Sequence, residues 1–184
     1  LYAARGIIAN PNCSTIQMVV ALKPIHDVAR IKRVVVSTYQ SVSGAGRKAM
    51  EELSQQVAAL FSGKEIEKEK FPHQFAFNCI PHIDAFTENG YTKEEMKMVN
   101  ETGKILNEPA LPVTATTVRL PVFSSHPESD NVETERKLTA KQAKALFREA
   151  PGIIVADEPE SDVYPMALDA VGIDATLVGR IRED

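Results

Sequence analysis

The chain has 184 residues, of which 43% are hydrophobic, enough for one domain with a substantial core but not for two complete domains. The formal net charge of -4 gives no electrostatic reason to expect nucleic acid or an anionic membrane surface as a partner. No apolar run approaches the roughly 20 residues that cross a bilayer, and two cysteines without a C-x-x-C pair favour neither a disulfide framework nor a metal site, so we expect a cytoplasmic protein.

The first half of the chain predicts two helices separated by a strand. The turn at residues 10–12 precedes an apolar residue pattern of helical period, so a helix should begin near Ser14. β-Branched residues at 31–39 predict a buried strand. The Gly-rich segment 43–46 ends this strand, and residues 48–61 should form the second helix.

The second half of the chain predicts two further helices and several strands. Each helix is indicated by a capping box, in which two side chains satisfy free backbone N–H groups; the predicted ranges are 93–106 and about 140–149. β-Branched and alternating patterns predict strands at 75–80, 113–122, 153–156 and 176–181. Because helices and strands alternate irregularly, we expect an α/β fold of the α+β type around a mixed sheet.

Cys13 is the most distinctive candidate for chemistry. It follows a turn at the start of a predicted helix, where free N–H groups and the helix dipole favour an anion. Such a setting lowers the pKa of a thiol, so we expect Cys13 to be a reactive thiolate. The alternative is that Cys13 is a small packing residue, the commoner role of a cysteine. Cys79 lies in an apolar segment and is expected in the core.

Four histidines are available as partners for the thiol: His26, His73, His82 and His126. Periodicity does not choose among them. Catalytic groups are often displayed where a strand passes into a loop, which favours His126 and His82.

Arg119 occupies an unusual place for a cation. It shares a face of the predicted strand 113–122 with Ala115 and Thr117, and β-branched neighbours mark that strand as half-buried. A buried guanidinium needs an anionic partner, which is either a protein carboxylate or the carboxylate of a substrate.

Two further patterns are weak by themselves. Glu94, Lys97, Glu101 and Lys104 form a charged stripe along the predicted helix 93–106, and such stripes are normally solvent-exposed faces. The segment 43–46 is rich enough in glycine to approach a phosphate or the edge of a nicotinamide ring, but it is short.

The segment 10–17, with the sequence Asn-Pro-Asn-Cys-Ser-Thr-Ile-Gln, resembles the active-site cysteine segment of aspartate-semialdehyde dehydrogenases. Further resemblances to that family follow in order and cover nearly the whole chain, at residues 36–46, 76–84, 94–102, 119–126 and 179–182. Related families are less similar: N-acetyl-glutamyl-phosphate reductases usually have Gly and Tyr beside the nucleophile, where this chain has Asn12 and Ser14.

The resemblance implies a role for each candidate residue. Cys13 would form a covalent thioester, His126 would be the general acid and base, and Gln40 would orient the substrate. The substrate would be held by the remaining polar candidates, with its carboxylate on Arg119, its amine on Glu94 and its phosphate on Lys97. Ser43 and Gly44 would lie against the cofactor, and His82 would be structural.

The implied activity is the NADPH-dependent conversion of β-aspartyl phosphate to aspartate semialdehyde, in the biosynthesis of lysine, threonine, methionine and diaminopimelate. The resemblance further implies a largely antiparallel mixed sheet with helices on one face, like the C-terminal domain of glyceraldehyde-phosphate dehydrogenase, in a homodimer or homotetramer.

We expect residues 1–184 to be the catalytic and dimerisation domain of a longer protein. The family's Gly-rich Rossmann fingerprint, which would bind most of the NADP, is absent from this sequence. The isolated chain should therefore not turn over. The alternatives are a dimerisation scaffold without a competent site, a relative of the N-acetyl-glutamyl-phosphate reductases, and a Cys–His hydrolase, for which the sequence supplies no group that orients the histidine.

Overall fold

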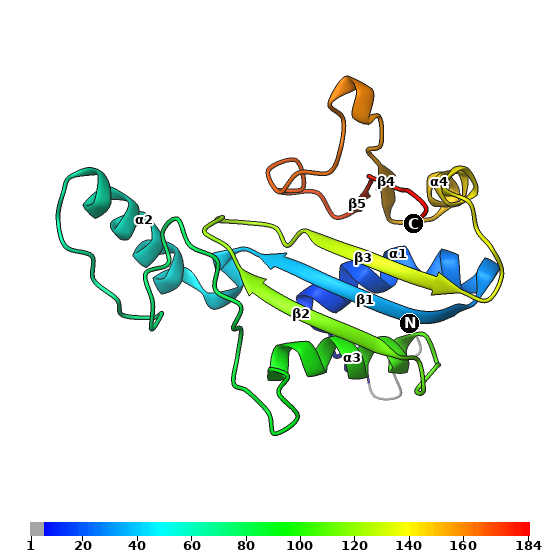
Figure 1. Ribbon diagram of the computed structural model, residues 1–184, viewed down its shortest axis with the longest axis horizontal. Helices are drawn as coiled ribbons and strands as arrows, with labels where there is room; N and C mark the ends of the chain where they lie inside the picture. The colour runs from blue at the N-terminus through cyan, green and yellow to red at the C-terminus, as the bar shows by residue number, and fades with distance from the viewer. Residues whose placement is uncertain (1–5) are drawn as a thin grey trace.

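A three-stranded sheet lies at the centre of the computed structural model, which describes residues 6–184 (Figure 1). Its middle strand is β1 (Ile31–Gln40), flanked by β2 (Val113–Arg119) and β3 (Glu128–Thr134). β1 is parallel to β2 and antiparallel to β3, so the predicted α+β fold with a mixed sheet is confirmed.

The sheet is less antiparallel than the resemblance implied, because one of its two strand pairings is parallel. The connection between β1 and β2 contains the helices α2 (Arg47–Phe61) and α3 (Lys93–Ile105). This long crossover returns the chain to the end of the sheet at which β1 begins, and so β2 runs in the same direction as β1.

One face of the sheet is covered by α3 and by α1 (Cys13–Ala29), as expected from the resemblance (Figure 1). Every second side chain of β1 points to these helices, which gives an alternation of buried and more exposed residues along the strand. The core between sheet and helices consists of Met18, Leu22, Ile31, Val34, Val36, Met98, Leu106, Val113 and Ala115. Because this core joins α1, α3, β1 and β2, it fixes the ends of these elements relative to one another.

The helices begin within one residue of their predicted starts. Thr92 and Glu95 form the predicted capping box of α3, and Thr139 with Gln142 forms that of α4 (Ala140–Glu149). α1 begins one residue before the predicted Ser14. Beyond α4 lie two short parallel strands, β4 (Ile153–Val155) and β5 (Thr176–Val178), and the 3-10 helix η2 (Pro159–Ser161).

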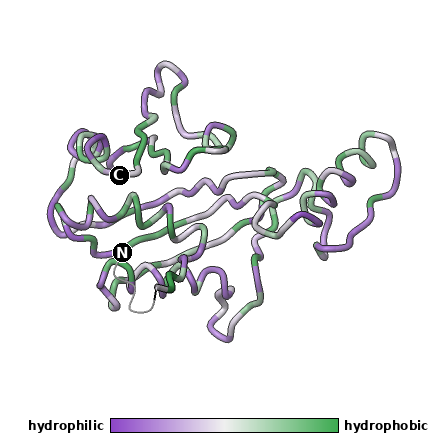
Figure 2. The backbone as a smooth tube through the Cα atoms, turned by 180° about the vertical axis from the view of Figure 1, so that it is seen from behind, coloured by the Kyte–Doolittle hydropathy of each residue, from purple (hydrophilic) through white to green (hydrophobic). Residues whose placement is uncertain are grey.

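α2 extends away from the sheet and is preceded by a short 3-10 helix, η1 (Val42–Ala45) (Figure 1). The loop after α2 carries the charged residues 64–70 and is hydrophilic along most of its length (Figure 2). No helix among residues 6–184 is both long and apolar enough to cross a membrane.

The predicted strand at 75–80 is wrong. Phe75 and Ala76 donate their backbone N–H groups to Oε1 of Gln56, over 2.8 Å and 3.0 Å, rather than to a neighbouring strand. Phe77 has a positive φ of 60°, which no strand accommodates, and Ile80 alone forms a bridge to Arg119. The buried amide of Gln56 thus replaces a sheet ladder for this segment.

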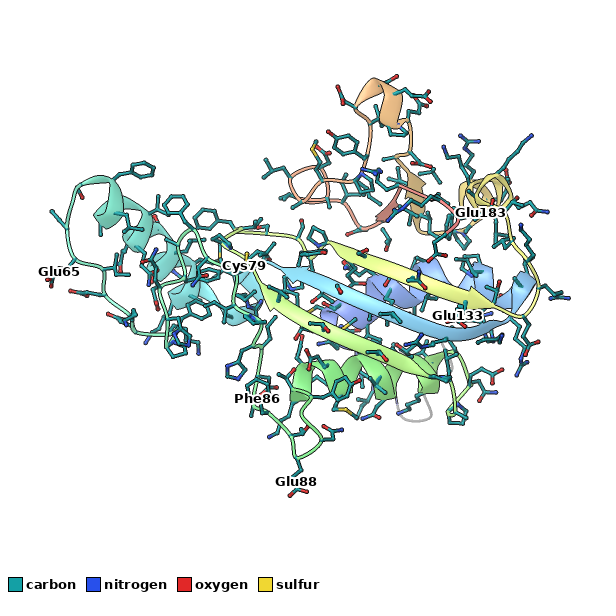
Figure 3. All side chains as sticks on the ribbon, in the orientation of Figure 1. Glu65, Cys79, Phe86, Glu88, Glu133 and Glu183 are labelled. Atoms are coloured by element: carbon teal, nitrogen blue, oxygen red, sulfur yellow. The ribbon has the colours of Figure 1, made fainter. Side chains whose placement is uncertain are left out.

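Cys79 was expected in the core, but it is exposed at the end of β2 near the base of α2 (Figure 3). The strand predicted at 113–122 is shorter, since β2 ends at Arg119, two residues before Pro121, which has no N–H for a sheet ladder. The strand predicted at 176–181 is also shorter, and β5 ends at Val178. β3 was not predicted, because its residues 128–134 are almost all polar and form an edge strand.

Candidate active site

The candidate residues gather where β1 and β2 end and α1 begins. Gln40 and Arg119 are the last residues of their strands and lie opposite each other in the parallel register. Both are buried, with 1% and 7% of their surface exposed. Cys13 is the first residue of α1 and is exposed.

The turn that presents Cys13 is held from two sides. Asn12 caps α1, since its Oδ1 accepts hydrogen bonds from the backbone N–H groups of Ser14 (3.0 Å) and Thr15 (3.2 Å). Asn12 is itself anchored to α3, because its Nδ2 donates to Glu94 (2.8 Å) and its backbone N–H donates to Glu101 (2.6 Å). α3 therefore fixes the position from which the Cys13 side chain projects.

Our expectation that the helix start lowers the pKa of Cys13 is wrong. Desolvation by the surrounding protein and the negative charge of Glu94 raise the pKa of this thiol above its ordinary value. The N–H groups of Ser14 and of Cys13 itself, together with the charge of Arg119, act in the opposite direction but do not outweigh the first two effects. Cys13 is therefore a protonated thiol at neutral pH and needs a base to become a nucleophile.

This raised pKa gives a first testable prediction. The rate of Cys13 alkylation by iodoacetamide should keep rising above pH 9, because only the thiolate reacts and the pKa lies above the ordinary thiol value of 9.0. Mass spectrometry of the Cys13 peptide across the pH range measures this rate. A plateau reached below about pH 8, which only a thiol with a pKa lowered below the ordinary value would show, would contradict the assignment.

Glu94 connects the nucleophile turn to Gln40. Its Oε1 accepts hydrogen bonds from Nδ2 of Asn12 and from Nε2 of Gln40 (3.2 Å), while its Oε2 accepts one from Nζ of Lys97 (3.2 Å). Burial alone would raise the pKa of Glu94, but these three hydrogen bonds lower it below the ordinary value. Glu94 is thus an ionised, buried carboxylate rather than part of a solvent-exposed stripe, as the sequence pattern alone suggested.

Lys97 lies at the edge of this group, nearly half exposed, between two carboxylates. Its Nζ lies 3.2 Å from Glu94 and 3.2 Å from Oδ2 of Asp84. The two carboxylates raise the pKa of Lys97 despite some desolvation. Asp84, which sequence reasoning did not identify, therefore helps to keep an ammonium group fixed and charged beside the site.

His126 is bound through one ring nitrogen only. Its Nδ1 accepts a hydrogen bond from the backbone N–H of Ser41 (3.3 Å) and lies 3.1 Å from Oγ of the same residue, which can act as donor or acceptor. Since Ser41 occupies Nδ1, Nε2 is the nitrogen available for proton exchange with a reactant, and it accepts a proton in the tautomer whose Nδ1–H donates to Oγ of Ser41. Desolvation, reinforced by the nearby charge of Arg119, lowers the pKa of His126 below its ordinary value. The imidazole is therefore neutral at pH 7 and suited to accept a proton.

Ser41 links His126 to Arg119. The guanidinium donates from one terminal nitrogen to the backbone carbonyl of Ser41 over 2.6 Å. Among residues 6–184 Arg119 forms no direct ion pair with a carboxylate, although Glu94 and Cys13 act on it electrostatically. The sequence argument required an anionic partner for this buried cation, and the remaining donors of the guanidinium are available to a bound anion.

Gly44 leaves an open space beside these groups. A Cβ atom at this position would lie 3.2 Å from Nε2 of His126 and 3.3 Å from a terminal nitrogen of Arg119. Ser43, also exposed, is joined to Ser41 by their hydroxyl groups over 2.9 Å. A flat ring can therefore approach His126 at Gly44, so the residues present fit the nicotinamide that the resemblance implies.

The structure thus brings together all eight candidates predicted from the sequence: Cys13, Gln40, Ser43, Gly44, Glu94, Lys97, Arg119 and His126. It adds Asn12, Ser41 and Asp84, of which Ser41 contacts two candidates and lies between Gln40 and Ser43 in the chain. His82 lies apart and stacks on Phe86. No group of three or more His, Cys, Asp or Glu residues within 6–184 is arranged to hold a metal ion.

Comparison with known proteins identifies similar chains. Residues 22–184 match the family described as semialdehyde dehydrogenase, dimerisation domain. An aspartate-semialdehyde dehydrogenase of Aquifex aeolicus is 58% identical over the whole chain, which covers 54% of that protein.

Solved structures agree with the sequence comparison. The crystal structure of aspartate semialdehyde dehydrogenase II from Vibrio cholerae is 52% identical with a TM-score of 0.94, over 98% of this chain and 53% of the other. A second structure of that enzyme, complexed with ASA, is 51% identical, also with a TM-score of 0.94, over 98% of this chain and 53% of the other. The chain thus spans about half the length of these relatives. The resemblance inferred from the motifs is confirmed, and the chain belongs to the semialdehyde dehydrogenase family, matching its dimerisation domain.

Proposed function

We propose that residues 1–184 are the catalytic and dimerisation domain of an NADP-dependent, cytoplasmic aspartate-semialdehyde dehydrogenase that serves the synthesis of lysine, threonine, methionine and diaminopimelate. The observation that carries this proposal is that Cys13, His126 and Arg119 lie together at the carboxyl ends of β1 and β2. Ser41 contacts both His126 and Arg119, while the charges of Glu94 and Arg119 act on Cys13. Such a set supplies a nucleophile, a base and an anion-binding group for acyl transfer from β-aspartyl phosphate.

The first step follows from the protonation states of the site. In the tautomer whose Nδ1–H donates to Oγ of Ser41, the neutral imidazole of His126 takes the proton of the Cys13 thiol on Nε2, and the sulfur attacks the carbonyl carbon of the acyl phosphate. The bond between this carbon and the phosphate oxygen breaks, which leaves a thioester on Cys13 and releases phosphate. The ammonium group of Lys97, fixed beside Glu94, would neutralise the departing phosphate.

The substrate is oriented by groups that are already fixed before it binds. Arg119 offers a planar pair of donors to the substrate carboxylate, and the buried negative charge of Glu94 favours the substrate ammonium group. The Gln40 amide is held by Thr38 (2.9 Å) and Glu94, so it does not rotate freely. Such preorganisation lowers the free energy needed to reach the reactive geometry.

Release of the aldehyde needs a hydride and a proton. NADPH, when bound, supplies the hydride to the carbonyl carbon of the thioester. His126, protonated in the first step, then returns its proton as the carbon–sulfur bond breaks and the Cys13 thiol is regenerated. The open space at Gly44, beside Nε2 of His126, is the place that suits the nicotinamide ring.

A chimaera tests this proposal. The chain replaces the matching part of the Aquifex aeolicus relative, of which it covers 54%. We expect phosphate-dependent reduction of NADP+ with aspartate semialdehyde and not with N-acetyl-glutamate semialdehyde. A folded chimaera that binds NADP+ but is inactive with the first aldehyde would contradict the proposal and favour a scaffold role.

We further propose that the chain forms a dimer through the face of the sheet that the helices leave uncovered. Two observations support the proposal. The matching family is described as a dimerisation domain, and the residues of this sheet face are half-buried to exposed and include both apolar and small polar side chains. On β1 and β2 it consists of Arg33, Val35, Ser37, Tyr39, Thr114, Thr116 and Val118. An open sheet face of this composition is stabilised when a second sheet covers it.

Val35→Glu should convert this dimer to a monomer, because it buries a charge in the middle of the proposed interface. Sedimentation velocity measures the change. The matched control is Val163→Glu, which makes the same substitution at an exposed valine of the loop near η2 and should remain dimeric. A wild-type monomer, or equal dissociation of both variants, would refute this interface.

A further inference from the structure

Glu128 is a half-buried acidic residue for which the proposed reaction has no use. It begins β3, two residues after His126, and lies opposite Thr38 in the antiparallel register. Because Thr38 faces the helices, Glu128 also points to that side, toward the first turn of α1. There it lies beside the side chains of Ser14 and Gln17.

Two polar atoms in this place have no hydrogen-bond partner. Oε1 of Glu128 and Oγ of Ser14 are both fully buried, and neither completes a hydrogen bond within the described part of the chain. A buried polar atom without a partner is unfavourable. Ser14 is near enough to act on the Glu128 carboxyl group, so a small rotation of either side chain would satisfy both atoms with one hydrogen bond. A carboxylate and a hydroxyl oxygen can form that bond in two ways, with the proton on either group.

The charge of the carboxyl group decides the direction of that bond. Burial, reinforced by the carboxylate of Asp130 on the same strand, raises the pKa of Glu128 to about 9. Ser14 and Gln17 on α1 lower this pKa without outweighing burial, and Thr38 on β1 is uncharged. Glu128 is therefore protonated at neutral pH and carries an O–H donor, for which Ser14 Oγ is the adjacent acceptor.

A second contact joins the same two segments. Nε2 of Gln17 donates a hydrogen bond to the backbone carbonyl of His126. Ser14 directly follows Cys13, and Glu128 follows His126 by two residues. The contacts of Ser14 and Gln17 therefore tie the turn that carries the thiol to the segment that carries the imidazole.

We propose that Glu128, as a neutral carboxylic acid, is a positioning residue that donates a hydrogen bond to Ser14 Oγ and so holds Cys13 and His126 in register. This inference rests on the proposed function of those two residues. Ionisation of Glu128 replaces the donor by a negative charge, loosens the first turn of α1 from β3 and slows the transfer of the thiol proton to the imidazole.

The test uses the chain itself, without any nicotinamide, and follows acylation of Cys13 by β-aspartyl phosphate. Glu128→Gln keeps an uncharged donor, so it should react within about twofold of the wild type at pH 7. Glu128→Ala and Ser14→Ala remove either end of the bond and should each slow acylation about tenfold. Alkylation by iodoacetamide, which needs no base, should change little in all three variants.

The pH profile separates positioning from a merely structural role. The ratio of the wild-type rate to the Glu128→Gln rate should fall about tenfold between pH 7 and about pH 10, since only the wild type ionises there. A constant ratio, a wild-type rate for Glu128→Ala, or a Glu128→Gln variant as slow as Glu128→Ala would each overturn the inference alone. A wild type that alkylates but does not acylate would overturn the proposed function and this inference with it.

Discussion

Cys13→Ser should abolish the dehydrogenase activity of the chimaera, with a fall in kcat of at least about 10⁴-fold. The expected loss is this large because the hydroxyl of serine is a far weaker acid than a thiol, and the neutral imidazole of His126 is too weak a base to ionise it. The substitution removes no packing of consequence, since residue 13 is exposed at the start of α1. Steady-state kinetics with aspartate semialdehyde, phosphate and NADP+ measures the effect.

Cys79→Ser is the matched control for this experiment. Cys79 is also exposed and free. It lies in the segment 75–80 that was expected to be a strand, next to Ile80, which bridges the last residue of β2. We expect its substitution to leave kcat and KM within about twofold of the wild-type values, as for surface substitutions in general. If Cys13→Ser kept more than one part in about a hundred of the activity, or if Cys79→Ser lost as much, Cys13 would not be the nucleophile.

Arg119→Leu should raise the KM for aspartate semialdehyde roughly 100-fold, since a charge-assisted pair of hydrogen bonds to a carboxylate is worth about 3 kcal/mol. The guanidinium is buried, is fixed by the carbonyl of Ser41, and has no carboxylate ion-pair partner within residues 6–184. Leucine fills much of the same space without an uncompensated charge, so the fold should persist. Arg119→Lys should recover only part of the loss, because lysine lacks the planar fork.

Lys97→Met separates the two anion-binding roles. Lys97 lies at the edge of the site, paired with Asp84 and Glu94, and should affect the KM for phosphate rather than that for the aldehyde. The opposite pattern, in which Arg119→Leu raises the KM for phosphate and Lys97→Met that for the aldehyde, would exchange the two assignments. Equal effects of both substitutions on both substrates would instead indicate a general loss of the positive potential of the site.

Local signals in the sequence predicted most of the helices. The capping boxes of α3 and α4 were found because both partners of each box lie within one helical turn. The β1 strand was equally clear from its β-branched residues. By contrast, the strand expected at 75–80 failed because Gln56, which lies in α2 and 19 residues before Phe75 in the chain, satisfies that backbone. No local pattern contains such a contact.

Chemistry at the site shows the same division between local and distant effects. The sequence placed Cys13 at a helix start, and the N–H groups there do lower its pKa, as expected. Partial desolvation by other elements and the charge of Glu94, which comes from α3, reverse the outcome. Ser41 went unnoticed for a similar reason, since a serine acquires its contacts to His126 and Arg119 only once three distant segments meet.

Detection of a covalent acyl group on Cys13 tests the central claim most directly. The isolated chain is incubated with β-aspartyl phosphate in the absence of nicotinamide and analysed by intact mass and peptide mapping. Because no hydride is available, an aspartyl thioester should accumulate on Cys13, should be absent from Cys79, which is also exposed, and should be removed by hydroxylamine. A chain that remains unmodified, or that carries the acyl group equally on both cysteines, would contradict the assignment of this site.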